Sequence, residues 1–423
     1  MKNKIIYIII LVLSIGISNI NAQKTSFTYE GLNMGPGYAN DIYYSMDEGQ
    51  IANIPRAGWD IAFYTCAISA GIIINEGSGS QLYCYPTGDT SDWESVDTVG
   101  MNSWKVLYNS PENWEDGAFN RNATGHPDYG WGVYNTVTHN VTGDSIYVIK
   151  VGNELKKLWI IKKVSINNIY HIRYANLDGS NEQIIELDIK PYVDKNFVYY
   201  SLVTNELLNR EPTDNWDLLF TKYIDITYDN SGIPVEYLVT GATSNINGYA
   251  NKFYPVPEDY DNFSAKPFDS LKNVIGYNWK SFNMASFSWM VEDSTVFFNM
   301  NQAGDVFKLI FTLWEGSSTG YFEFSTELIQ PSAINGETEN QLSVSVYPNP
   351  ASEFVVVNIN DDVSFNGKII INDLSGRVVY KSVINNTGGN VPLKISTNNF
   401  VKGMYTITIV SDEIMDTQKL VIR

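Results

Sequence analysis

The sequence predicts an all-β protein, in which two tandem antiparallel β-rich units precede an immunoglobulin-like β-sandwich. Three observations carry this prediction. The 423 residues include 28 Tyr, 19 Phe and 10 Trp, and aromatic residues favour strands. A short Trp-Asp motif occurs twice in similar surroundings. Residues 342–423 contain seven short alternating segments, which is the strand count of a small immunoglobulin-like domain.

The N-terminus reads as a secretory signal peptide over residues 1–22. Lys2 and Lys4 form its basic region, residues 5–17 are apolar, and Ala22 supplies a small residue at the cleavage point. No later stretch approaches the 18 apolar residues of a membrane-spanning helix. The sequence therefore predicts export, a mature chain from Gln23, and no transmembrane segment after signal removal.

The repeated motif organises the middle of the chain. Trp59-Asp60 and Trp216-Asp217 each begin an apolar run, and each is preceded by a Tyr-Tyr-Ser segment, at residues 43–45 and 199–201. Two further blocks match downstream at an offset of roughly 150 residues, and a fixed offset indicates an internal repeat. We expect unit one over residues 23–190, unit two over 191–328, and the two tryptophans buried at equivalent core positions.

Strand signals fill both units. The segments are β-branched or aromatic and are bounded by Gly, Asn, Asp or Pro, as antiparallel strands require. In unit one they are residues 41–46, 59–75, 81–85, 104–108, 145–151, 157–164 and 169–175. In unit two they are residues 197–203, 216–228, 235–240, 294–300, 305–314 and 320–328. Residues 109–141 lack regular periodicity, and so long a loop usually carries function or wraps a core.

The C-terminal part is set off by composition. Residues 329–341 are polar and contain Pro and Gly, which predicts a linker. The seven strands expected beyond it are residues 343–347, 354–359, 368–372, 378–381, 393–396, 404–410 and 418–422.

The two cysteines, Cys66 and Cys84, favour a disulfide, because an exported chain meets an oxidising compartment. They flank residues 76–80, which resemble a turn between two strands. A bridge here would stabilise the fold by roughly 3 kcal/mol in the chain-entropy model. The alternative is a pair of buried free thiols.

Charge and motifs exclude several functions. The net charge of −19 opposes nucleic-acid binding, which needs a basic face, and electrostatic attachment to anionic lipid. The sequence offers no metal-binding cysteine cluster, no ordered calcium loop and no nucleophile, zinc or nucleotide motif. We therefore expect no catalytic residues, no metal and no enzyme. The acidic residues beside Trp114 read as a surface loop rather than a glycosidase pair.

Several C-terminal motifs resemble one known family. They are Tyr347-Pro348-Asn349-Pro350, Asp373-Leu374-Ser375-Gly376-Arg377, Gly403-Met404-Tyr405 and the terminal Lys419-Leu420-Val421-Ile422-Arg423. This pattern is similar to the C-terminal sorting domain of the Bacteroidetes type IX secretion system. The resemblance implies that residues 342–423 engage the type IX machinery, so that the chain crosses the outer membrane and is released or attached to the outer cell surface.

The Trp-Asp units resemble the HmuY-like family of secreted haem-binding proteins. The matching features are the Tyr-Tyr-Ser strand, the run that follows Trp59-Asp60 or Trp216-Asp217, and the late strand around Lys308. The resemblance implies a haem site, and haem iron usually takes histidine ligands. Three histidines occur, and His171 lies in an alternating strand segment.

His126 and His139 are therefore the haem-ligand candidates. They lie on either side of Tyr129 and Trp131, which together with Trp114 are the predicted binding-loop aromatics. Haem or a related tetrapyrrole is thus one expected ligand. The alternatives are an adhesin that binds a host or surface glycan without a haem site, and, last, an extracellular hydrolase.

Overall fold

The computed structural model describes residues 27–86, 89–213, 215–229, 231–331, 343–360, 366–373, 377–385, 391–411 and 415–423. Their regular structure consists of β-strands and short 3-10 helices, which confirms the all-β class. The chain divides into two compact units, one up to Ser332 and one from Ala333. The predicted signal peptide and most of the predicted linker lie outside the described residues. The described residues contain no helix with the length and apolarity needed to cross a bilayer.

Within the first unit, one lobe packs a four-stranded sheet against an eight-stranded sheet. The four-stranded order is β15 (Glu206–Leu208), β14 (Phe197–Ser201), β4 (Ile61–Tyr64) and β5 (Ile72–Ile74). The larger sheet contains β13 (Gln183–Asp188), β12 (Ile169–Asn176), β11 (Glu154–Val164), β10 (Tyr147–Val151), β6 (Gln81–Cys84), β7 (Val106–Leu107), β8 (Gly132–Tyr134) and β9 (Val141–Gly143). Their facing apolar side chains, Phe63 and Tyr170 among them, form the first-lobe core.

The second lobe also packs two sheets. Its four-stranded sheet has the order β17 (Pro234–Ser244), β16 (Leu218–Tyr228), β2 (Asn40–Ser45) and β3 (Gly49–Pro55). Its five-stranded sheet contains β1 (Thr28–Asn33), β23 (Tyr321–Gln330), β22 (Val306–Trp314), β21 (Val296–Met300) and β18 (Tyr249–Phe253). A separate hairpin joins β19 (Lys280–Asn283) to β20 (Ser288–Val291). Phe220, Phe311 and Phe324 lie at the centre of this core.

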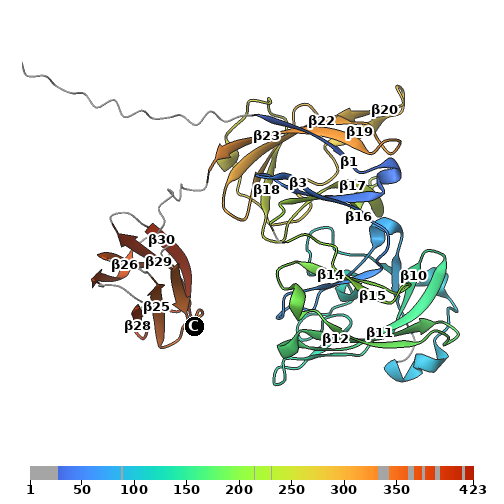
Figure 1. The fold of residues 1–423 in the computed structure, drawn as a ribbon, viewed down its shortest axis with the longest axis horizontal. Helices are drawn as coiled ribbons and strands as arrows, with labels where there is room; N and C mark the ends of the chain where they lie inside the picture. The colour runs from blue at the N-terminus through green and yellow to red at the C-terminus, as the bar shows by residue number, and fades with distance from the viewer. Residues whose placement is uncertain are drawn as a thin grey trace, which may run out of the picture. The chain divides into compact units, whose positions relative to one another are not determined.

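The two lobes exchange strands. β2 pairs with β16, and β14 pairs with β4, so each Tyr-Tyr-Ser strand joins the Trp-Asp strand of the other half. In Figure 1 the blue strands β1 and β3 accordingly lie among the yellow and orange strands of the second lobe. The sequence predicts a boundary near residue 190, whereas the strand pairing assigns residues 28–55 to the second lobe and 197–208 to the first. Pairing partners are set by tertiary contacts, which local periodicity does not encode. The HmuY-like character of the lobes stays a prediction.

Each Trp-Asp pair holds an exchanged strand through its aspartate. An Asp60 carboxylate oxygen accepts a hydrogen bond from the Leu202 backbone N–H at 2.7 Å, and Asp217 Oδ2 accepts one from Met46 at the same distance. Both aspartates are buried. Hydrogen bonds to a charged acceptor are stronger than neutral ones, so each carboxylate fixes the end of the strand donated by the other half.

The two tryptophans have matching neighbours. The rings of Trp59 and Tyr199 meet edge to face at 4.8 Å, and those of Trp216 and Tyr43 do so at 5.3 Å. Both indoles are buried. The Tyr43 and Tyr199 hydroxyls lie 3.1 Å apart, so the two arrangements meet at the junction of the lobes.

The second compact unit forms two antiparallel sheets. One contains β24 (Ser343–Tyr347), β25 (Phe354–Asn360) and β28 (Val391–Ser396); the other contains β27 (Val378–Asn385), β26 (Asn366–Asp373), β29 (Gly403–Ser411) and β30 (Met415–Ile422). These strands overlap the seven expected segments. Both sheets contribute to one apolar core that includes Val357 and Ile407. The immunoglobulin-like topology stays a prediction.

The predicted disulfide is wrong, because Cys66 and Cys84 are both free. Residues 76–80 do lie between two strands, β5 and β6, as predicted. These strands belong to different sheets, because β5 pairs with β4, whereas β6 pairs with β10 and β7 in the other sheet of the lobe. The turn therefore crosses from one sheet to the other, and the two cysteines belong to different layers.

Candidate functional site

The structure brings the two candidate histidines together. His126 and His139 are exposed and line one pocket of about 250 Å³, here called the histidine pocket. Tyr134, on β8, lies between them in sequence and packs its ring against both imidazoles, at 5.5 and 6.0 Å. Lys163 also lines the pocket and donates hydrogen bonds to the backbone carbonyls of residues 66, 67 and 69. Burial lowers the pKa of Lys163 to about 8.

The histidine pocket does not fit haem held between two histidines. Such a haem needs its two imidazoles on opposite faces of the porphyrin, and Tyr134 already contacts both rings. Its hydroxyl lies 2.6 Å from His139 Nδ1. In the neutral imidazole, His139 Nε2 is free to ligate a metal only if Nδ1 carries the proton and donates it to the tyrosine oxygen. Haem binding by His126 and His139 stays a prediction.

The other predicted site residues lie in different surroundings. Trp131 is fully buried, and its indole N–H donates to the Ala70 carbonyl at 2.9 Å. Trp114 is half-buried and donates to the Ser244 carbonyl at 2.8 Å, so it joins the two lobes. Tyr129 is half-buried and lines the histidine pocket. His171 lies half-buried on β12, as the strand pattern predicted.

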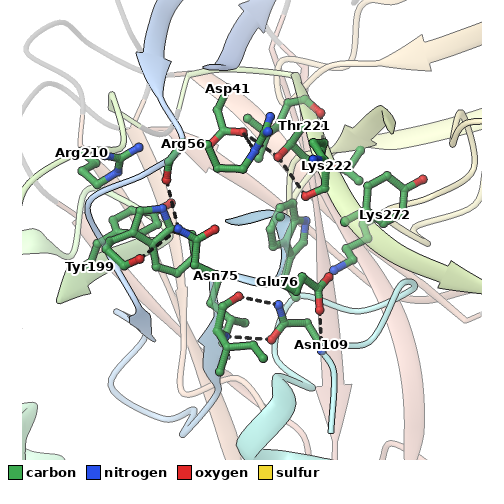
Figure 2. A pocket seen from close by; sticks show the side chains of 18 of the residues that line it. Asp41, Arg56, Asn75, Glu76, Asn109, Tyr199, Arg210, Thr221, Lys222 and Lys272 are labelled. Atoms are coloured by element: carbon green, nitrogen blue, oxygen red, sulfur yellow. Dashed lines mark hydrogen bonds and ion pairs between the residues drawn. The ribbon is translucent and has the colours of Figure 1, made fainter. Parts of the chain in front are cut away.

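A small cavity lies at the junction of the lobes, with a volume of about 70 Å³. Figure 2 shows Asp41, Arg56 and Thr221 gathered at one end and Glu76 with Lys272 at the other. Arg56 Nε donates to Asp41 Oδ1 at 2.8 Å, and the Thr221 hydroxyl donates to the same oxygen at 2.7 Å. The volume suits a few waters rather than an organic ligand.

The buried charged residues at this junction connect the two lobes through hydrogen bonds. Glu76 accepts hydrogen bonds from the backbone N–H groups of Asn109, at 3.0 Å, and Ile224, at 2.9 Å. Burial raises the pKa of Glu76 and lowers that of Lys272, while the attraction between their charges offsets part of both shifts. Glu76 thus binds the loop after β7 to β16. The junction is a hydrogen-bonded interface between the lobes.

A larger depression lies on the second lobe and is called here the aromatic groove. Its volume is about 510 Å³. Its walls come from β17, from the β19–β20 hairpin and from the end of β22. Its aromatic lining is Tyr38, Tyr237, Tyr277, Phe282, Trp289 and Trp314, and its remaining lining is Thr227, Leu238, Val239, Thr240, Lys280, Ser281 and Ser317.

The groove aromatics form a continuous row. Ring centroids lie 5.4 Å apart for Phe282 and Trp289, 6.4 Å for Trp289 and Trp314, and 5.3 Å for Trp314 and Tyr38. Gly316 permits this arrangement, because a Cβ atom there would lie 2.4 Å from Trp289 Nε1. Phe282 and Trp289 nevertheless remain 42% and 37% exposed. Apolar faces left open to water in a concave site are typical of a binding surface.

Lys280 is the one lysine of the groove lining. Its Nζ donates to the Thr240 carbonyl at 2.6 Å and to the Tyr277 carbonyl at 3.3 Å. The same atom lies 4.0 Å from the Trp279 ring centroid and 4.3 Å from that of Trp314. Burial lowers the pKa of Lys280 well below its usual value.

Sequence reasoning missed the aromatic groove. The available signal was the segment from Phe282 to Met290, in which apolar side chains surround a short turn between two strands. Phe282, Met284, Phe287, Trp289 and Met290 are all exposed on the β19–β20 hairpin. Tyr237 comes from a distant strand, so only the tertiary structure unites these side chains.

Comparison with known families settles the role of the second compact unit. Residues 345–423 match the family described as the secretion system C-terminal sorting domain. They form a type IX secretion sorting domain. The predicted export route is thereby confirmed: the sorting domain engages the secretion machinery, and the chain is released or attached at the outer cell surface.

Other comparisons establish no relationship for the two lobes. No curated protein matches the chain. The chain is 12% identical to dimeric latent PorU from Porphyromonas gingivalis, covering 93% of this chain and 34% of PorU at a TM-score of 0.18. Alpha-2-macroglobulin of E. coli is 8% identical to this chain. The match covers 94% of this chain and 23% of the macroglobulin, at a TM-score of 0.18. The BSP domain of a biofilm associated protein is 10% identical to this chain. The match covers 94% of this chain and 81% of the BSP domain chain, at a TM-score of 0.17.

This chain thus spans about a third of the PorU chain and about a quarter of the macroglobulin. At these TM-scores the likenesses carry no argument about fold or function.

Proposed function

We propose that this protein is a non-enzymatic glycan-binding protein of the outer cell surface or its surroundings, and that the glycan lies in the aromatic groove. The observation that carries the proposal is the row of four neighbouring rings in a concavity of about 510 Å³, of which Phe282 and Trp289 are the most exposed. Export by the type IX route brings this groove to the outside of the cell, where polysaccharides are abundant.

The chemistry of the groove suits a sugar. A pyranose ring presents C–H groups on its faces, and the electron-rich face of an aromatic ring attracts them. Hydroxyl groups at the sugar's edge need hydrogen-bond partners, and Thr227, Ser281 and Ser317 line the same groove. An extended row of rings with polar groups along it also suits several sugar units better than one small molecule.

The groove lining also supports a role without catalysis. Glycosidases typically need a pair of carboxylates that flank the scissile bond. None of the residues that line the groove is Asp or Glu. The groove therefore has side chains for holding a sugar chain but lacks the acid and base for cleaving it.

A binding experiment with the full chain tests this proposal. A glycan array would identify ligands, and titration calorimetry would measure their affinity. Truncating the partly exposed Trp289 to Ala should weaken binding about tenfold. Tyr254→Ala is the matched control, because Tyr254 is 58% exposed but does not line the groove. Binding unaffected by Trp289→Ala, or an array without any signal, would contradict the proposal.

A tetrapyrrole is the second candidate ligand, favoured by the shared position of His126 and His139 in one pocket. Haemin titration followed by absorbance in the Soret region separates the two. A Soret shift that is lost in the variant with both His126→Ala and His139→Ala would establish histidine ligation and would require Tyr134 to move. Titration without a shift would leave the glycan as the remaining candidate.

A further inference from the structure

The electrostatic character of the aromatic groove is opposite to that of the whole protein. The chain has 47 acidic and 28 basic residues, yet no carboxylate lines the groove and Lys280 does. Glu236 and Glu315, which neighbour lining residues in sequence, are not among the lining side chains. Acidic residues would repel an anionic ligand, so a groove lining without them is compatible with such a ligand.

Lys280 has no anionic partner in the groove wall, and burial disfavours its charged form and lowers its pKa well below the usual value. Both acceptors that the structure gives its ammonium group, the Thr240 and Tyr277 carbonyls, are neutral. Within the described part of the chain, no carboxylate lies within ion-pair distance of Lys280. Removing a charge from water is costly unless a counter-charge repays it. A ligand carboxylate in the groove would supply that counter-charge.

We infer that the glycan bound in the aromatic groove is acidic, and that Lys280 binds the carboxylate of a uronic or sialic acid unit in it. This inference rests on the proposed glycan-binding function and narrows it to a class of ligand. The rings of Trp289 and Phe282 pack on the sugar faces, while the ammonium at the groove wall sets the position of the charged unit. The rest of the lining, being neutral, leaves one favoured place for a single carboxylate.

The structural role of Lys280 must be separated from this one. Its contacts with the Trp279 and Trp314 rings, at 4.0 and 4.3 Å, stabilise the groove wall whether or not a ligand is present. Lys266 has a similar structural role elsewhere: its Nζ donates to the Lys252 carbonyl and lies 4.9 Å from the Phe253 ring. Lys266 does not line the groove, so it provides a matched lysine for comparison.

The first test needs no substitution. Each acidic glycan that the full chain binds on an array is compared with the same glycan after its carboxyl groups are reduced to primary alcohols. We expect the acidic form to bind about tenfold more tightly or better, because hydrogen bonds to charged groups contribute more than neutral ones. Equal affinity for both forms would overturn the inference and leave the glycan-binding function intact. An array on which only neutral glycans bind would overturn the inference alone, and an array without any signal would overturn both.

The second test assigns the charge to Lys280. Lys280→Met should lower affinity for the acidic glycan about tenfold, so that the preference for the acidic form over its reduced form is lost. Remaining binding of the reduced form shows that the groove is folded. Lys266→Met should alter neither affinity. Acidic-glycan affinity retained in Lys280→Met would overturn the role of this lysine. If Lys280→Met does not fold, the comparison of acidic and reduced glycans still decides the ligand class.

Discussion

At the scale of single residues, the Tyr43–Tyr199 pair marks the junction of the two lobes. Each ring packs on the tryptophan of one Trp-Asp motif, and the two hydroxyls meet at 3.1 Å in the buried space between the lobes. Sequence alone identified Trp59 and Trp216 as core positions, because a repeated large aromatic residue in a strand is readily read as buried. It could not show that the tyrosines meet, because that contact spans 156 residues.

Removing both hydroxyls should cost less than the sum of the costs of removing each one alone. Tyr43→Phe leaves the Tyr199 hydroxyl buried without its partner, and we expect a loss of about 1–2 kcal/mol in the free energy of unfolding. Adding Tyr199→Phe removes this unpaired hydroxyl. The double variant should therefore lose less free energy of unfolding than the sum of the losses in the two single variants. Urea denaturation of the four proteins of the cycle measures this coupling. Strictly additive losses would show that the two hydroxyls do not interact.

At the scale of elements, the exchanged strand β14 begins at a carboxylate clamp. Glu211 Oε1 accepts hydrogen bonds from the Asn196 backbone N–H and the Trp216 indole N–H, at 3.1 and 3.0 Å, and Oε2 accepts one from Phe197 at 2.8 Å. Burial outweighs these bonds and raises the pKa of Glu211 to about 7. One buried side chain thus binds the start of β14 to the motif that precedes β16.

This clamp predicts that stability falls as pH rises. An unfolded glutamate releases its proton near pH 4.3, whereas folded Glu211 keeps it until about pH 7. The folded state therefore binds more protons between these values, so its stabilisation is complete below about pH 4.3 and is lost as pH rises through about 7. Asp217, whose pKa burial raises to about 6, changes stability in the same direction.

Urea denaturation between pH 5 and 8 measures this dependence. Glu211→Gln cannot release a proton, so the free energy of unfolding should decline less steeply with pH in this variant than in the parent. Glu206→Gln, at an exposed position on β15, serves as the control and should keep the parent slope. A Glu211→Gln slope equal to that of the parent would assign the pH dependence to other groups.

Most elements were predictable, whereas their partners were not. The C-terminal strands fell where short apolar alternation placed them, because alternation alone distinguishes the two faces of a strand. The exchange of β2 and β14 lay beyond this reasoning, since both strands carry the same Tyr-Tyr-Ser pattern and either Trp-Asp strand could accept them. The aromatic groove could not be predicted from the sequence for a related reason. Trp289 and Tyr237 come from separate hairpins, and no local pattern joins them.

At the scale of the whole molecule, strand exchange makes the two lobes one folding unit. β4 cannot complete its sheet without β14, and β16 cannot complete its own without β2. The sorting domain has a separate core. Residues 27–331 should therefore unfold in one cooperative transition, and the sorting domain in another.

Core truncations test this cooperativity in scanning calorimetry. Phe63→Ala in the first lobe and Phe220→Ala in the second each remove a buried ring, at a cost of about 3–5 kcal/mol. Both should lower the midpoint of the same single transition. Ile407→Ala, in the sorting-domain core, should leave that transition in place. A Phe63→Ala protein with one lobe melting early and the other at the parent temperature would refute a shared unit.

The crossing strands also dictate an order of events for a chain that emerges from its N-terminus. β2 appears early, but its partner β16 begins only at Leu218, after nearly all of the first lobe. Until then one strand edge has unsatisfied backbone groups, which makes it prone to wrong pairing with other chains. The segment that contains β2 must therefore be kept from pairing with other chains until β16 is available. Two lobes that folded independently would not impose this requirement on the exporting cell.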